Sequence, residues 1–122
     1  MAFDHLGFNV GDLAQSRAFY TAALAPLGLV PVMEGDKWVA FGHAKRPEFW
    51  LGRYGDAPGR IHVAFAAQSR AQVDLFYTEA MQAGGKDNGK PGLRLDYHPH
   101  YYGAFVLDPD GHNIEAVCHR PE

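Results

Sequence analysis

Two short segments of the chain alternate between apolar and polar positions. Residues 5–10 read HLGFNV, and residues 61–66 read IHVAFA. Alternation with a period of two predicts a β-strand with one face on a core, so we expect Leu6 to pack on a helix. In each segment a histidine, His5 or His62, falls on the opposite face. A histidine there either forms local hydrogen bonds or serves as a metal ligand or catalytic base.

The two segments belong to an internal duplication. Residues 5–28 and 62–85 align without a gap and share nine identities over 24 positions, where chance gives roughly one or two. His5 and His62 are one of the identical pairs. Two copies are too few for a solenoid, so we expect them to share one core. A histidine repeated at the same register favours a ligand over a purely structural side chain.

Each copy contains a predicted helix after its first strand. Asp12 and Ser69 are each followed three residues later by glutamine, a pattern that caps the first turn of a helix. We expect the first helix to end near Gly28 and the second at Gly84–Gly85. Three short strands are predicted after each helix: residues 29–33, 37–43 and 48–54, then residues 93–98, 101–107 and 113–119.

Glycine and proline mark the connections between these elements. Residues 84–92, which read GGKDNGKPG, are predicted to form a mobile loop, and DPDG at residues 108–111 a tight hairpin turn. Each half is therefore strand, helix and three strands, which predicts an α+β domain with the helices on one side of mainly antiparallel strands. We expect one domain over residues 1–122, with modules of about 1–57 and 58–122.

Composition excludes several classes of protein. The chain is 47% hydrophobic and 20% charged, with a net charge of -3, which is typical of a globular protein and gives no reason to expect nucleic acid or a membrane as partner. We find no signal peptide and no apolar run long enough to span a bilayer. The single cysteine, Cys118, cannot form an intrachain disulfide. These features favour a reducing, cytoplasmic location.

The last predicted strand supplies an acid that complements the two histidines. Ile114 and Cys118 lie on its apolar face, which leaves Glu115 on the other face. A buried carboxylate needs a cation or several donors. Together, His5, His62 and Glu115 form a set that binds Zn, Mn, Ni or Fe(II) with positions left for water and substrate. The alternative is a metal-free protein in which these residues hydrogen-bond one another.

The sequence resembles the vicinal oxygen chelate superfamily in three segments: DHLGFNVGDLAQSRAFY, IHVAF and GAFVLDPDGHNIEAV. The superfamily includes glyoxalase I, fosfomycin-resistance transferases, bleomycin-resistance proteins and extradiol dioxygenases. The resemblance implies two βαβββ modules that form an incomplete mixed barrel around a cavity. It implies metal ligands at His5, His62 and Glu115, and a homodimer that in some members completes the site across the interface.

The chain departs from each named branch of the superfamily. Glyoxalase I has an acid where this chain aligns Trp50, although Glu48 lies two residues away on the same face and a shifted register would supply it. Fosfomycin transferases carry a threonine where this chain has Gly7. Extradiol dioxygenases typically have four modules rather than two. The resemblance therefore indicates the superfamily without selecting a reaction.

The resemblance also places the segment DYHPHYYG near the mouth of the cavity. His98 and His100 are two residues apart and would form a second metal site in a strand, but Pro99 favours a loop. Arg94 is a candidate for holding an anionic group. The candidate catalytic residues are Glu48, His98 and Tyr102, and the candidate pocket residues are Trp38, Trp50, Arg53, His100 and Tyr101.

Two functions are compatible with this reading. The first is a metal-dependent enzyme of the glyoxalase type, lyase- or isomerase-like, that acts on a small oxygenated metabolite or its thiol adduct. The second is a binding protein of the bleomycin-resistance type that sequesters a small ligand without catalysis. The three retained ligand residues favour the enzyme.

Several remaining residues are expected to be structural. Tyr20 and Tyr77 repeat on the two helices and are assigned to the core, as is Cys118. His43 and His112 lie near turns and are expected to be solvated.

Overall fold

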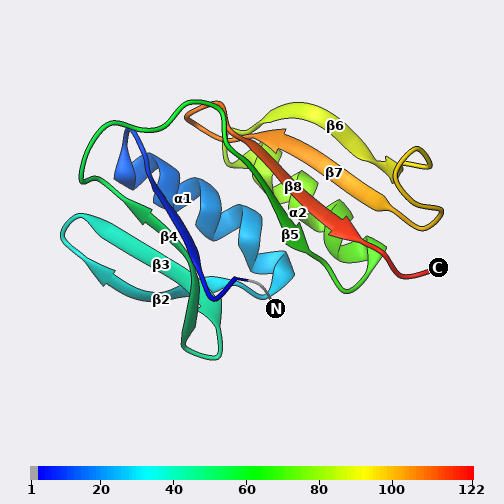
Figure 1. Cartoon of the computed structure of the whole chain (residues 1–122), viewed down its shortest axis with the longest axis horizontal. Helices are drawn as coiled ribbons and strands as arrows, with labels where there is room; N and C mark the ends of the chain where they lie inside the picture. Colours follow the sequence, from blue (N-terminus) through cyan, green and yellow to red (C-terminus); the bar gives the residue numbers. More distant parts are fainter. Residues whose placement is uncertain (1–2) are drawn as a thin grey trace.

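The computed structural model describes residues 3–122 and arranges them as two mixed four-stranded sheets and two helices (Figure 1). The elements are β1 (Leu6–Asn9), α1 (Leu13–Leu24), the short 3₁₀ helix η1 (Ala25–Leu27), β2 (Val30–Gly35), β3 (Trp38–His43), β4 (Arg46–Gly52), β5 (His62–Ala66), α2 (Arg70–Gln82), β6 (Lys86–Leu93), β7 (Tyr102–Leu107) and β8 (Asn113–Cys118).

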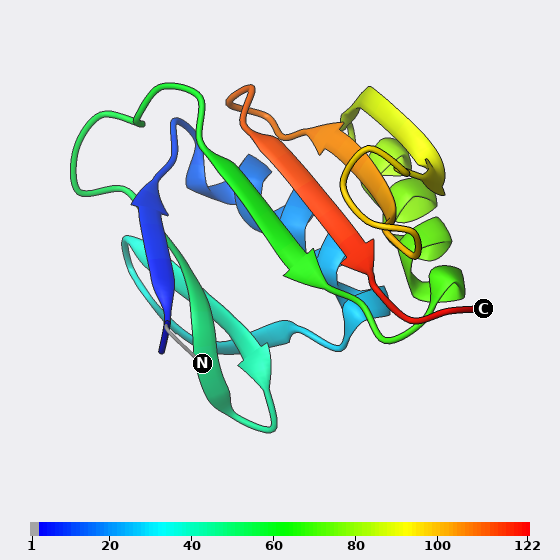
Figure 2. The ribbon, with the colours of Figure 1, turned by 45° about the vertical axis from the view of Figure 1, so that its right-hand side comes forward.

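The two modules repeat the same topology. The sheet orders are β1-β4-β3-β2 and β5-β8-β7-β6, with one parallel pair in each, β1 with β4 and β5 with β8. Both helices lie on the same side of the sheets, which do not close into a barrel (Figures 1 and 2). This is the predicted α+β fold of two βαβββ units. Among the described residues, no helix has the length and apolar character needed to cross a bilayer.

The predicted helix ends are confirmed. Asp12 and Ser69 each accept a hydrogen bond from the backbone N–H three residues on, at 3.1 and 3.2 Å. The chain leaves the two helical regions through Gly28 and Gly84, which have φ angles of 86° and 100°. Side chains are strained at such angles, so these glycines end the helices at the expected places.

The core lies between the helices and the sheets. Phe19, Tyr20 and Phe76 are fully buried, and Cys118 is buried with them, as predicted. The prediction for Leu6 is wrong, because the residue is 41% exposed. Leu6 begins an edge strand, which has a neighbouring strand on one side only.

Polar contacts join the two modules at the turn between β7 and β8. The hydroxyl of Tyr20 on α1 donates to Asp108 Oδ2 at 2.5 Å, and the backbone N–H of Gly11 donates to Asp110 Oδ1 at 3.1 Å. The same Asp108 accepts two backbone N–H groups of its own turn on Oδ1. The predicted DPDG turn therefore also holds the first module in place.

One stretch of the second module differs from the prediction. Lys86–Leu93, expected to be part of a mobile loop, forms β6 and pairs with β7. Strand β6 is an edge strand, which tolerates Pro91 and a glycine with positive φ, Gly89, because its register shifts around them. Apart from Leu93, the strand predicted over residues 93–98 is instead a loop closed by hydrogen bonds between Arg94 and Tyr101 and within the segment.

Candidate functional site

A buried carboxylate lies on the face of the second sheet that points away from the helices. Glu115 on β8 is 1% exposed and is hydrogen-bonded through both oxygens. Nε2 of His62 donates to Oε1 at 2.8 Å, and the hydroxyl of Tyr101 donates to Oε2. The structure thus brings together two of the predicted ligands and one predicted pocket residue.

The local sequence explains this cluster. Ile114 and Ala116 are fully buried in the core, so the alternation of β8 turns Glu115 to the opposite face. A Cβ atom at Gly103 would lie 3.2 Å from the ring of Tyr101, so the glycine leaves room for the tyrosine that reaches Glu115. Burial and the neighbouring Glu115 carboxylate raise the pKa of Tyr101, which keeps its hydroxyl protonated as a donor.

The His62–Glu115 pair is close to the spacing of two ligands of one metal ion. Ligand atoms 2.0–2.2 Å from a tetrahedral zinc lie about 3.4 Å from each other, so an ion would replace the 2.8 Å hydrogen bond after a small widening of the pair. The His62 side chain is 55% exposed, so the pair is open to solvent on one side. An imidazole and a buried carboxylate in this geometry fit Zn, Mn, Ni or Fe(II).

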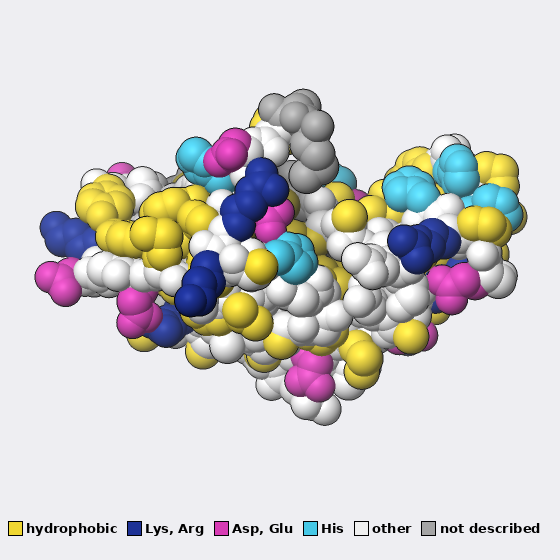
Figure 3. Space-filling model, turned by 90° about the horizontal axis from the view of Figure 1, so that it is seen from below, with side chains coloured by type: hydrophobic (Ala, Val, Ile, Leu, Met, Phe, Trp, Pro, Cys, Tyr) yellow, Lys and Arg dark blue, Asp and Glu magenta, His cyan; other side chains and the backbone are white. Residues whose placement is uncertain are grey.

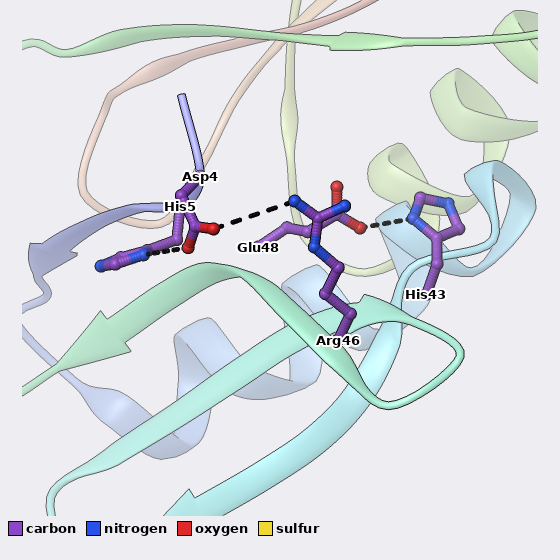
Figure 4. Close-up of polar contacts among 5 residues, drawn as sticks. All are labelled: Asp4, His5, His43, Arg46 and Glu48. Carbon is purple, nitrogen blue, oxygen red and sulfur yellow. Dashed lines mark hydrogen bonds and ion pairs between the residues drawn. The ribbon is translucent and has the colours of Figure 1, made fainter. Parts of the chain in front are cut away.

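The third predicted ligand, His5, lies in a different environment. Its Nδ1 donates to Asp4 Oδ1 at 2.8 Å, and Arg46 approaches the other oxygen of Asp4 at 3.8 Å (Figure 4). The hydrogen bond with His5, with help from Arg46, lowers the pKa of Asp4. This pattern assigns the ring proton to Nδ1. The lone pair of His5 Nε2 is then left to bind a metal ion, as in the carboxylate–histidine pairs of metal sites.

The two half-sites lie at opposite ends of the paired modules. Strands β1 and β5 run in opposite directions (Figures 1 and 2). Phe49, which pairs with the first residue of β1, contacts Phe65 near the end of β5, with ring centroids 5.1 Å apart. His5 therefore lies level with the end of β5, whereas His62 begins that strand. Within residues 3–122 the ligand atoms of His5, His62 and Glu115 do not all come within 4.8 Å of one another.

The strand register settles which residue of the first module corresponds to Glu115. Trp50 pairs with Gly7, as Glu115 pairs with Ala64, and positions 7 and 64 are equivalent in the duplication. The first module thus has tryptophan where the second has the acid. Glu48 lies at the register shift of the β3–β4 pair, so alternation does not fix its face, and it accepts a hydrogen bond from His43 at 2.6 Å (Figure 4).

The predicted histidines of the 94–101 loop are at the surface. His98 lies with its ring centroid 5.7 Å from that of His100 and 5.5 Å from that of His119, and Figure 3 shows histidines gathered at this end of the molecule. The backbone N–H of His100 donates to His98 Nδ1 at 3.0 Å. In the neutral ring Nε2 of His98 then carries the proton, so this arrangement does not present His98 as a metal ligand.

Two other predicted site residues hold structural contacts. The hydroxyl of Tyr102 donates to Asp74 on α2 at 2.7 Å, which directs Tyr102 away from the face that carries Glu115. A catalytic role for Tyr102 stays a prediction. Arg53 donates to the carbonyl of Gly11 at 2.6 Å and so secures the loop after β1. Trp38 and Trp50, by contrast, line a cavity of about 370 Å³ on the first sheet.

Asp108, Asp110 and His112 are the one group of described residues whose possible ligand atoms all lie within 4.8 Å. Their oxygens are occupied by the turn and inter-module hydrogen bonds given above. Nδ1 of His112 accepts the backbone N–H of Ile61 at 3.0 Å, so its Nε2 carries a proton. The prediction that His112 is solvated is wrong, because it is fully buried as part of the joint between the modules. The DPDG motif by itself does not predict that His112 is buried.

His43 is exposed, as predicted, and it also forms two hydrogen bonds. It donates through Nδ1 to Glu48 and through Nε2 to the carbonyl of Leu27, at 2.6 and 3.2 Å. The hydrogen bond to Glu48 raises the pKa of His43, despite partial burial. This residue therefore connects the β3–β4 hairpin to the end of the first helix.

Comparison with known proteins identifies the family. A model of the Glyoxalase/Bleomycin resistance protein/Dioxygenase superfamily matches residues 2–116, and the chain belongs to this superfamily. An uncharacterised protein of Bacillus subtilis, YqjT, is 30% identical over an alignment 131 residues long. The alignment covers 93% of this chain and 96% of the relative.

Solved structures show the same fold. A glyoxalase/bleomycin resistance protein from Albidiferax ferrireducens superposes with a TM-score of 0.84 at 30% identity, covering 99% of this chain and 100% of the other. A lactoylglutathione lyase from Agrobacterium tumefaciens superposes with a TM-score of 0.68 at 21% identity, covering 96% of this chain and 92% of the other.

Proposed function

We propose that this protein is a metal-dependent enzyme of the glyoxalase type, lyase- or isomerase-like, that acts on a small oxygenated metabolite or its thiol adduct. The observation that carries the proposal is the buried Glu115 carboxylate, held 2.8 Å from His62 and fixed on its other oxygen by Tyr101. The lactoylglutathione lyase among the structural relatives supports the thiol-adduct class. The buried free thiol of Cys118 agrees with a cytoplasmic location.

The metal would be held by His62 Nε2 and Glu115 Oε1 of one chain and by His5 of a second copy. Support comes from the opposite placement of the two half-sites and from the free lone pair of His5 Nε2. A symmetric homodimer would then contain two equivalent sites. Each chain would contribute both half-sites, one to each centre.

Different residues of the chain have different roles around that centre. A bound divalent ion would polarise a carbonyl or acidify a bound water. Tyr101 holds Glu115 so that Oε1 alone faces His62, and Asp4 keeps the proton of His5 on Nδ1. Glu48 and His98 remain candidates for proton transfer to the substrate, His98 from the loop beside Tyr101.

Metal content of the purified protein is the direct test. The protein should take up Zn, Mn, Ni or Fe(II), and His62→Ala should abolish uptake while leaving the fold intact, since the imidazole is more than half exposed. Leu75→Ala, at an exposed position of α2, is a surface control that should keep the metal. A wild-type protein that takes up none of these ions would contradict the proposal.

Mixing two inactive variants tests the shared site. His5→Ala and His62→Ala should each lose metal, but refolding them together should restore one intact centre in each mixed dimer. A site within one chain would give no recovery.

Tyr101→Phe should weaken metal binding by about 10- to 100-fold, because residues that orient a ligand typically contribute that much.

The cavity on the first sheet favours a second function, namely ligand sequestration without catalysis as in bleomycin-resistance proteins. Its two tryptophans suit binding rather than proton transfer. Saturable binding by a metal-free protein that converts no 2-oxoaldehyde adduct, epoxide or catechol in any metal-loaded form would favour this alternative.

A further inference from the structure

The cavity on the first sheet is lined without any charged side chain. Its volume of about 370 Å³ lies within the usual range for small-molecule sites. Figure 3 shows hydrophobic side chains gathered at the end of the molecule that carries this sheet. The lining residues are Gly7, Phe8, Asn9, Trp38, Trp50, Leu51, Gly52 and Tyr54.

Two stacked indoles form one wall of this cavity. The rings of Trp38 and Trp50 have centroids 4.8 Å apart and planes inclined by 28°. They come from adjacent strands, and each is paired across the sheet with a small residue, Trp38 with Gly52 and Trp50 with Ala40. The small partners leave room beside the two indoles, and the imidazole of His5 lies next to Trp50, with ring centroids 5.9 Å apart.

A glycine keeps the space beside Trp50 clear. A Cβ atom at Gly7 would lie 2.9 Å from the Cβ of Trp50, closer than real Cβ contacts. The equivalent position in the second module is Ala64, which lies beside Glu115 and does carry a side chain. The first module has therefore exchanged an acid for an indole at a point where no side chain stands opposite.

We infer that this cavity binds an uncharged, planar ring system, aromatic or conjugated, through stacking on Trp38 and Trp50. Uncharged lining disfavours an ionic group, and stacked indoles favour flat π-systems over saturated rings of the same size. Asn9 adds one polar group, since its Oδ1 accepts the backbone N–H of Tyr54 at 3.1 Å and its amide N–H₂ is a donor. The inference depends on the proposed function in one respect only: it takes the bound ring to be part of the substrate of the enzyme.

Calorimetric titration with 2-naphthol tests the inference, with decahydro-2-naphthol as a saturated probe of similar size and 2-naphthoate as a charged one. We expect 2-naphthol to bind at least about tenfold more tightly than either. The chain contains two tryptophans, both in the cavity, so quenching of intrinsic fluorescence gives a second readout. Equal affinity for the planar and saturated probes would overturn the inference.

Variants separate this site from the metal site. Trp50→Leu should weaken 2-naphthol binding about tenfold, Trp50→Phe should retain part of it, and Leu75→Ala on the exposed side of α2 should leave it unchanged. His62→Ala should keep 2-naphthol binding even where it loses metal. Unchanged binding in a folded Trp50→Leu protein would overturn the inference, whereas a wild-type protein that takes up no metal would count only against the enzyme.

Discussion

The two modules keep the same interior but present different open faces. Identical residues such as Phe19 and Phe76 occupy the shared core, and both modules cap their helices in the same way. On the open faces, the second module places Glu115 where the first places Trp50. Packing constrains the interior of both copies at once, whereas a side chain on an open face can change without disturbing its counterpart.

The largest expected effect tests whether the cores of the two modules contribute equally to the free energy of unfolding. Phe19→Ala and Phe76→Ala should each lower the free energy of unfolding by about 3–5 kcal/mol, because each removes a fully buried ring. Urea denaturation measures both. If one substitution cost less than about 1 kcal/mol, the two helices would not be equivalent in the core.

The paired tyrosines should be unequal. Tyr20→Phe removes the donor to the buried Asp108 and should cost about 1–3 kcal/mol. Tyr77→Phe, at the equivalent position but half-buried, should cost less than about 0.5 kcal/mol. A loss for Tyr20→Phe as small as that for Tyr77→Phe in urea denaturation would show that this hydrogen bond between the modules contributes little to stability.

The hairpin turns should respond to glycine in opposite directions. Gly111 in the second module has a φ of 86°, so Gly111→Ala should destabilise the protein by about 1–2 kcal/mol. Ala44 in the first module has a φ of 47° without being glycine, so Ala44→Gly should stabilise it by up to about 1 kcal/mol. Thermal unfolding of the two variants should move in opposite directions from the wild type.

The smallest effect depends on pH and belongs to the first module. Glu48 raises the pKa of His43 above its ordinary value of 6.5, so the stabilisation is fully present below pH 6.5 and is lost as the pH rises through the raised pKa. The pair is partly exposed, so the effect should stay below about 1 kcal/mol. Urea midpoints of the wild type should fall relative to those of His43→Gln over this range, and parallel profiles would contradict the assignment.

Local patterns predicted most of the fold because they act over a few residues. The caps at Asp12 and Ser69 and the DPDG turn are confirmed. The glycine and proline of residues 84–92 predicted a loop, but most of this segment forms the edge strand β6. An edge strand needs hydrogen bonds on one side only and tolerates glycine and proline. Tertiary pairing decided this stretch.

The site was predicted in part for a similar reason. Strand alternation placed Glu115 on the same open face as its strand neighbours from β5, and the structure brings it to His62. Alternation cannot tell which ends of two strands meet, so the separation of His5 from His62 was not predictable. The burial of His112 and the contact of Tyr102 with Asp74 depend on partners far away in the sequence.

The hydrogen bonds of the β7–β8 turn also bear on the stability of the separated halves. Asp108 and Asp110 of the second copy now depend on donors from Tyr20 and Gly11 of the first. A fragment that began near residue 58 would keep both carboxylates and lose those donors. Asp108 would keep only the two backbone donors of its own turn, so we expect the separated halves to be less stable than the joined chain.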